Sequence, residues 1–197
     1  MRYALVLVVV ALAFGSAFAG TNPDIRIYLD ADPPNMISRV DPAASEQFTV
    51  SVVVDCLGEG GGFRGTGLLL ERTFTGFKLS QTNLLPAGLD FGDAEVDPGW
   101  TFVAGPDCPM PDENDMVVIG ILEYLYLGGP GTLAIRPHGL VEPGTGREAL
   151  DCYYASDYWC IVGNLGVGAD APPGDADCDC DTPVEESTWG SIKAFYR

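Results

Sequence analysis

The chain has 197 residues, with 28 acidic and 10 basic side chains, and its formal net charge at pH 7 is −18. This acidity argues against nucleic-acid binding, which needs a basic surface to displace counterions, and against attachment to anionic lipid. The length suits one domain with a good core and is short for two.

Residues 1–19 are predicted to be a cleaved secretory signal. Arg2 opens it, residues 4–14 form an unbroken apolar run, and Ala17-Phe18-Ala19 places small residues where signal peptidase reads them. The run is shorter than the ~20 apolar residues of a spanning helix, so we expect no membrane insertion after cleavage. The mature chain is therefore expected to be secreted, either extracellular or on the cell surface, with the periplasm as an alternative.

Short strand patterns follow one another along the mature chain. Apolar and polar residues alternate over residues 48–55, and shorter candidates lie at 25–29, 66–74 and 100–103. Residues 116–127 are apolar on both faces, which predicts a central strand with a kink at Gly120. Residues 131–136 alternate again, and the turn Gly128-Gly129-Pro130 predicts a hairpin with the preceding strand.

Gly- and Pro-rich connectors separate these runs, at residues 58–62, 86–92, 105–111 and 143–146. Short strands separated by such connectors predict an all-β fold, an antiparallel β-sandwich of jelly-roll or immunoglobulin-like type. We expect the sandwich over residues 20–168, then an acidic Pro/Gly/Asp linker over 169–186 and a C-terminal segment, 187–197, that packs on the sandwich. The spacing of Trp189, Ile192 and Phe195 in that last segment allows a short helix, and a final strand is equally compatible.

All six cysteines follow the signal: Cys56, Cys108, Cys152, Cys160, Cys178 and Cys180. An even number in an exported chain favours disulfides. Cys152 and Cys160 close a short loop and are expected to pair, and the turn around Cys108 could return it to Cys56. Cys178 and Cys180 would form a strained ring with each other, so at least one is expected to bond elsewhere. Sequence does not choose among the fifteen connectivities, and a zinc site, with poor ligand spacing, is the alternative.

Several strand motifs resemble those of cohesin-like modules, which are extracellular β-sandwich domains similar to carbohydrate-binding modules. Residues 46–55 (EQFTVSVVVD) resemble the early strand of that family, and residues 63–70 (FRGTGLLL) resemble the following one. Residues 84–96 resemble the next stretch, and residues 131–135 (GTLAI) are similar to the late strand. The resemblance covers about residues 24–140. It implies a nine-strand jelly roll used for protein–protein attachment outside the cell. The cysteines and the extension from Cys152 onward are not typical of the family.

Aromatic side chains between Cys152 and Cys160 form a candidate binding site. Planar rings with polar tips suit contacts to a sugar or a protein, and the cluster consists of Tyr153, Tyr154, Tyr158 and Trp159. Packing of these rings on the edge of the sandwich is the alternative.

The acidic linker holds a candidate calcium loop. Alternating carboxylates and a glutamate at the twelfth position give the ligand spacing of such a loop: Asp175, Asp177, Asp179, Asp181 and Glu186. Cys180 stands where the turn favours glycine, and Pro183 stiffens the loop, so a solvated acidic linker is the alternative. No other cofactor is expected.

Catalysis is not expected from these residues. His138 is the single histidine and lies in a predicted turn, and no serine lies in a GxSxG motif. Glu123 with Asp90, Asp93 or Asp97 would be the carboxylate pair of a glycosidase, which is a minority alternative. The sequence favours a non-catalytic module for extracellular protein–protein attachment. A carbohydrate-binding accessory module is the second hypothesis, so the expected partner is an extracellular protein or a polysaccharide.

Overall fold

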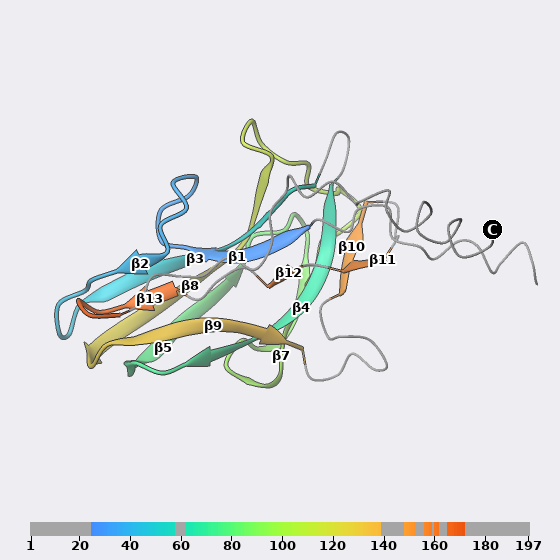
Figure 1. Ribbon diagram of the computed structural model, residues 1–197. Coiled ribbons are helices and arrows are strands. Elements are labelled where there is room, and N and C mark those ends of the chain that lie inside the picture. The colour runs from blue at the N-terminus through green and yellow to red at the C-terminus, as the bar shows by residue number, and fades with distance from the viewer. Residues whose placement is uncertain are drawn as a thin grey trace, which may run out of the picture.

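The computed structural model describes residues 25–57, 62–138, 148–152, 156–158, 160–161 and 165–171. In this part of the chain every regular element is a strand, and no helix is present that could cross a membrane. The thirteen strands form two sheets, which pack on a shared hydrophobic core (Figure 1).

One sheet has five strands, and we call it the five-stranded sheet. Their spatial order is β12 (Cys160–Ile161), β1 (Arg26–Asp30), β3 (Gln47–Asp55), β8 (Met116–Gly128) and β5 (Thr75–Asn83). The short pair β12–β1 is parallel, and the other pairs are antiparallel.

The other sheet has eight strands, and we call it the eight-stranded sheet. Its main path is β11 (Ser156–Tyr158), β10 (Glu148–Asp151), β4 (Phe63–Arg72), β9 (Gly131–Pro137), β13 (Leu165–Val167) and β2 (Arg39–Val40). Off this path, β7 (Val96–Val103) pairs with β4, and β6 (Leu89–Asp93) pairs with β7. The pair β13–β2 is parallel and the others are antiparallel.

The core lies between the sheets because alternate residues of each strand point to the same face. From the five-stranded sheet it takes Val50, Val52, Ile119, Leu122 and Tyr124, all fully buried. From the eight-stranded sheet it takes Leu68, Trp100, Phe102, Leu133 and Ile135, which are equally buried. Each such side chain stabilises the fold by roughly 1.5–3 kcal/mol. These buried side chains show which positions of each strand face the core, so the alternate positions of the same strand face outward.

The predicted all-β sandwich and the central position of residues 116–127 are confirmed. β8 lies between β3 and β5, and its pairing with β3 shifts register beside Gly120, where a kink was expected. The thirteen strands exceed the nine that the family resemblance implies because β2, β11, β12 and β13 add pieces of two or three residues.

The predicted hairpin between β8 and β9 is wrong. Gly128 and Gly129 have φ angles of 127° and 75°, and after them the chain enters the eight-stranded sheet. There β9 pairs with β4 and β13, whereas β8 pairs with β3 and β5. A glycine-rich turn suits both a hairpin and a crossover between sheets, so the turn residues alone do not decide between them.

Two strands at one edge of the sandwich differ from the sequence prediction. β5 was not predicted, and residues 86–92 were expected to be a connector, although Leu89–Asp93 form β6. Leu89, Asp90, Phe91 and Gly92 are all exposed, so neither face of β6 is buried at these positions.

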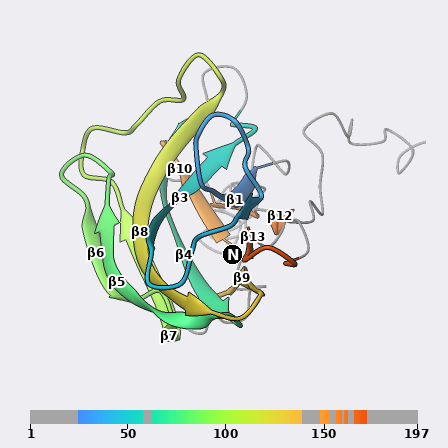
Figure 2. The ribbon, with the colours of Figure 1, turned by 90° about the vertical axis from the view of Figure 1, so that its left-hand side faces the viewer.

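Side chains of β5 bridge to β6 across the gap between the two sheets. Gln81 donates from Nε2 to the Gly92 carbonyl (2.9 Å) and accepts at Oε1 from the Ala94 backbone N–H (3.0 Å). Lys78 forms an ion pair with Asp93 and is itself mostly buried. Figure 2 shows β5 and β6 side by side at this edge, which we call the β5–β6 seam.

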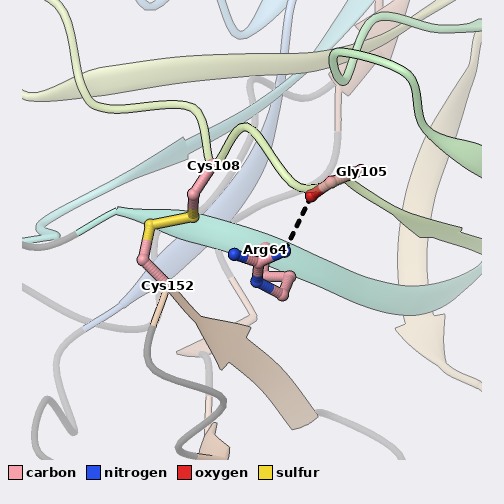
Figure 3. Close-up of a disulfide and its surroundings, with 4 residues drawn as sticks. All are labelled: Arg64, Gly105, Cys108 and Cys152. Atoms are coloured by element: carbon pink, nitrogen blue, oxygen red, sulfur yellow. Dashed lines mark hydrogen bonds between the residues drawn. A yellow bond between two sulfur atoms is a disulfide. The ribbon is translucent and has the colours of Figure 1, made fainter.

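A disulfide between Cys108 and Cys152 ties the loop after β7 to the end of β10 (Figure 3). The same loop is held to β4, because Arg64 donates from Nη1 to the Gly105 carbonyl (2.7 Å) and the Phe63 N–H bonds to the Pro109 carbonyl (3.1 Å). β4 pairs with both β7 and β10, which brings two distant parts of the sequence together.

The predicted pairings of Cys152 with Cys160 and of Cys108 with Cys56 are therefore wrong. Strand pairing brings the Cα atoms of Cys108 and Cys152 to 5.6 Å, within the usual disulfide range, although they are 44 residues apart. Cys56 is also disulfide-bonded. Cys178, Cys180 and the side chain of Cys160 lie outside the described residues.

Candidate functional site

The outer face of β6 and β7 carries large apolar side chains. Trp100 and Phe102 of β7 point into the core, so the alternate residues Thr101 and Val103 point outward. Phe91 pairs with Thr101 and Leu89 with Val103, which places Leu89 and Phe91 on the same outward surface. We call these four outward positions and their neighbours on β4 the β6–β7 face.

The β6–β7 face is open to solvent at its apolar positions. Leu89 is 63% exposed and Phe91 is 61% exposed, and Val96, at the start of β7, is 59% exposed. Isolated exposed apolar residues are ordinary, but several on one strand surface indicate a site where another molecule binds.

His138 fills the space beside this face that two glycines leave. A Cβ on Gly67 would lie 3.0 Å from the His138 ring, and one on Gly99 would lie 2.9 Å from it. Nε2 of His138 shares a hydrogen bond with Oγ1 of Thr101 (3.0 Å), the outward residue opposite Phe91. Burial lowers the pKa of His138, and the Asp97 carboxylate opposes this shift. The predicted turn histidine is thus a buried side chain that supports the face.

A groove of about 490 Å³ lies on β4, β9 and the start of β7. It is lined by Leu69, Leu70, Glu71, Arg72, Glu95, Asp97 and Arg136. Arg72 holds Glu95 through two bonds of 3.0 and 3.2 Å, and Arg136 bonds Glu71 at 2.8 Å. Both arginines are therefore already paired with carboxylates. The groove is a polar border of the β6–β7 face and does not form an anion site.

Buried charges elsewhere in the described residues have structural partners. The Asp30 carboxylate is fully buried and accepts the backbone N–H groups of Asp32, Met36 and Ile37 at 2.8–2.9 Å. Arg26 holds Asp55 across β1 and β3, with Nε 2.8 Å from Oδ1. These groups fix loop and sheet geometry, and no cluster of three or more metal-ligating side chains occurs among the described residues.

The carboxylates considered for a glycosidase have separate surroundings. Glu123 lies on the outer face of the five-stranded sheet and accepts a hydrogen bond from Ser80 Oγ (2.7 Å). Asp93 forms an ion pair with Lys78, and Asp97 lines the groove on the eight-stranded sheet. Asp90 is exposed on β6.

The binding sites predicted from sequence fall largely outside the described residues. This applies to Tyr153, Tyr154, Trp159 and the side chain of Tyr158, whose backbone belongs to β11. It applies equally to the candidate calcium ligands Asp175, Asp177, Asp179, Asp181 and Glu186. Both sites remain predictions.

The sequence patterns do not predict the β6–β7 face, because its apolar residues Leu89 and Phe91 lie in residues 86–92, which have the composition of a connector. Leu89 and Phe91 do alternate with Asp90 and Gly92, which is a strand signal. Only two apolar residues carry that signal, and Pro86 and Gly88 precede them, so the composition favours a turn over a strand.

The fold is similar to a cohesin module from a family 33 glycoside hydrolase of Clostridium perfringens. The two structures superpose with a TM-score of 0.51 and 10% sequence identity, over 75% of this chain and 98% of the module. No protein-family model and no curated protein matches the sequence. At this identity the comparison establishes a cohesin-like fold, and it confirms the resemblance seen in the strand motifs.

Proposed function

We propose that this chain is an exported, non-catalytic module that attaches to another protein outside the cell. The observation that carries the proposal is the β6–β7 face, where Leu89 and Phe91 are 63% and 61% exposed on one strand surface. A cohesin-like fold supports the same class of function, although a fold alone does not fix function. The predicted signal over residues 1–19 supports the location.

The composition of the face suits a protein partner. Phe91 and Leu89 are large enough to act as anchors that lose their water on binding, and aromatic anchors are typical of interface centres. Gly65 and Gly67 of β4 pair with Val103 and Thr101. Gly65 is buried and the His138 ring occupies the space beside Gly67, so His138 borders the anchors on this side.

The groove would form the rim of such an interface. Arg136 and Glu71 are paired and about half exposed, with side-chain exposures of 44% and 57%. Exposed rim charges contribute to the association rate and to the choice of partner more than to affinity. We therefore expect partner affinity to depend mainly on Leu89 and Phe91.

The test is a double substitution, Leu89→Asp with Phe91→Asp. Both side chains are exposed, so the variant should fold normally, and circular dichroism checks this. The partner is first captured from the culture medium of the source cells and identified, and its affinity is then measured by calorimetry with the purified pair. We expect at least a roughly tenfold loss of affinity in the double variant.

The matched control is Met110→Asp, which changes a 55% exposed apolar side chain in the loop between β7 and β8. It should bind the partner as the unmodified chain does. Unchanged affinity in the Leu89/Phe91 variant would contradict the proposal. So would binding to a polysaccharide that this variant retains and a Tyr158→Ala, Trp159→Ala variant loses, since that result assigns binding to the aromatic loop.

A further inference from the structure

A second exposed apolar surface lies on the outer face of β5 and β8. Leu122, Tyr124 and Tyr126 point into the core, so the alternate residues Leu125 and Leu127 point outward. Phe77 of β5 is paired with Leu125 and shares its face. Phe77 is 59% exposed and Leu127 is 40% exposed, and Leu79, at a register shift in β5, is 47% exposed beside them. We call Phe77, Leu125 and Leu127 the β5–β8 patch.

The β5–β8 patch belongs to the five-stranded sheet, whereas the β6–β7 face belongs to the eight-stranded sheet. The two surfaces share no residue, so substitutions can test them separately. At the other end of the same outer face, Tyr28, Val53 and Met116 form a small cluster that is already buried. Among these outward apolar groups, the β5–β8 patch is the one that remains open.

The surroundings of this patch are poor in charge. The outward register positions beside it hold uncharged residues, namely Gln47, Thr49, Ser51, Thr82 and Ile121. Glu123 is the one charged residue at the described outward positions of β3, β5 and β8 around the patch, and its carboxylate is bonded to Ser80. Lys78, paired with the inward Tyr124, is directed to Asp93 at the β5–β6 seam.

This lack of charge is informative because the whole chain is strongly acidic, with a formal net charge of −18. Two copies of an acidic molecule repel each other wherever carboxylates meet. Contact through a face that carries almost no charge avoids this repulsion, and depletion of charge is the compositional mark of an interface centre. A basic partner would instead be matched by carboxylates, and an acidic partner by Lys or Arg.

We propose that the β5–β8 patch is the contact surface of a symmetric dimer, in which a second copy of this chain occupies it. A two-fold axis brings the same patch from both copies together, so Phe77, Leu125 and Leu127 of each copy cover those of the other. The patch is small compared with the ~800 Å² per partner of standard interfaces, so the dimer is weak and reversible.

The test is the concentration dependence of molecular mass for the exported chain. Sedimentation equilibrium and small-angle scattering between about 10 µM and about 1 mM should show a reversible monomer–dimer equilibrium. Phe77→Asp should weaken dimerisation at least about tenfold, because each dimer would bury two new carboxylates against apolar groups. Met110→Asp, a comparable change outside the patch, should dimerise as the unmodified chain does.

Salt gives an independent readout. Raising NaCl from about 0.1 M to about 1 M shortens the Debye length from about 10 Å to about 3 Å, so the repulsion between acidic copies weakens. Dimerisation through the apolar patch should therefore strengthen with salt, whereas an interface held by ion pairs would weaken.

A chain that stays monomeric over the whole range, or a Phe77→Asp variant that dimerises unchanged, would overturn the proposal. Loss of dimerisation in the Leu89→Asp, Phe91→Asp variant but not in Phe77→Asp would also overturn it, since the contact would then lie on the β6–β7 face. Partner affinity measured on Phe77→Asp separates the two proposals, because the attachment function predicts no change there.

Discussion

The His138 ring fits beside the β6–β7 face because two neighbouring residues are glycines. Gly67 and Gly99 leave the space for its ring, and Thr101 bonds its Nε2. The ring is only 7% exposed, and desolvation therefore favours its neutral form and lowers its pKa below the ordinary value of about 6.5. Folding is consequently coupled to the loss of a proton from this group.

We predict that His138 makes the protein less stable at mildly acidic pH. In the unfolded chain the imidazole takes up a proton as pH falls through about 6.5, whereas in the folded chain it does so only at lower pH. Between these two values the free energy of unfolding should fall as pH falls, by at most about 1.4 kcal/mol per pH unit. Urea unfolding between about pH 5.5 and 7.5, a range that includes this window, measures the slope.

The comparison for this slope is His138→Gln, whose amide does not titrate. Other groups that titrate in this range, such as the α-amino group, contribute equally to both proteins and cancel in the difference. The unmodified chain should lose stability relative to the variant as pH is lowered. Parallel slopes for the two proteins would show that His138 is accessible to protons in the folded state.

β8 and β7 meet across the core through a glycine and a tryptophan. Gly120 pairs with the inward residue Val52, and a Cβ at this position would lie 2.6 Å from Cη2 of Trp100. Trp100 is fully buried and packs against Phe102, with ring centroids 4.7 Å apart. Gly120 thus makes room for the largest side chain of the core.

We predict that Gly120→Ala lowers the free energy of unfolding by about 1–3 kcal/mol, because the new methyl group overpacks the core against Trp100. Chemical denaturation measures the loss. In the variant Trp100→Phe the smaller ring leaves space, so the combined variant should lose less than the sum of the two single variants. Additive losses would place the cause in the backbone of β8 and not in the contact with Trp100.

At the scale of elements, strands with a complete burial pattern could be predicted from the sequence and edge strands could not. Apolar and polar residues alternate along β3, and β8 is apolar on both faces apart from Glu123, so both strands and the all-β class were predicted. β5 and β6 lie at the edge and contain no buried residue, so their apolar residues are few. Phe77, Leu89 and Phe91, which carry both proposed surfaces, belong to these two strands.

Long-range pairing set the second limit on prediction. The choice between a hairpin and a crossover after Gly129 depends on which sheet accepts β9, and the pairing of Cys108 depends on where β10 lies. Neither is a property of the local sequence. Nearness along the chain suggested Cys152–Cys160, but nearness in space follows from the register of β4 with β7 and β10.

At the scale of the whole molecule, the disulfides and the predicted export can be tested together. Protein purified from the culture medium should begin at Gly20, and its unreduced peptide map should join Cys108 to Cys152. Cys56 should be joined to Cys160, Cys178 or Cys180. A Cys108→Ser, Cys152→Ser variant should lose up to about 4 kcal/mol of stability, the chain-entropy value for a loop of 44 residues.

Free thiols at Cys108 and Cys152 in the exported protein would contradict this linkage. A chain that retains residues 1–19 outside the cell would contradict the predicted cleavage. The same unreduced map on protein from a reducing cytoplasm is the control, since there the bond between Cys108 and Cys152 should be absent.

The β5–β6 seam bears on how these molecules behave when crowded. An open strand edge is a template on which another chain can add, and repeated addition builds fibrils. Here the side-chain amide of Gln81 forms hydrogen bonds with the backbone of residues 92 and 94, as a neighbouring strand would. The charged pair of Lys78 and Asp93 lies beside it. Because these side chains occupy the seam, another chain is hindered from adding to β5 or β6 there, and this route to fibril growth is disfavoured.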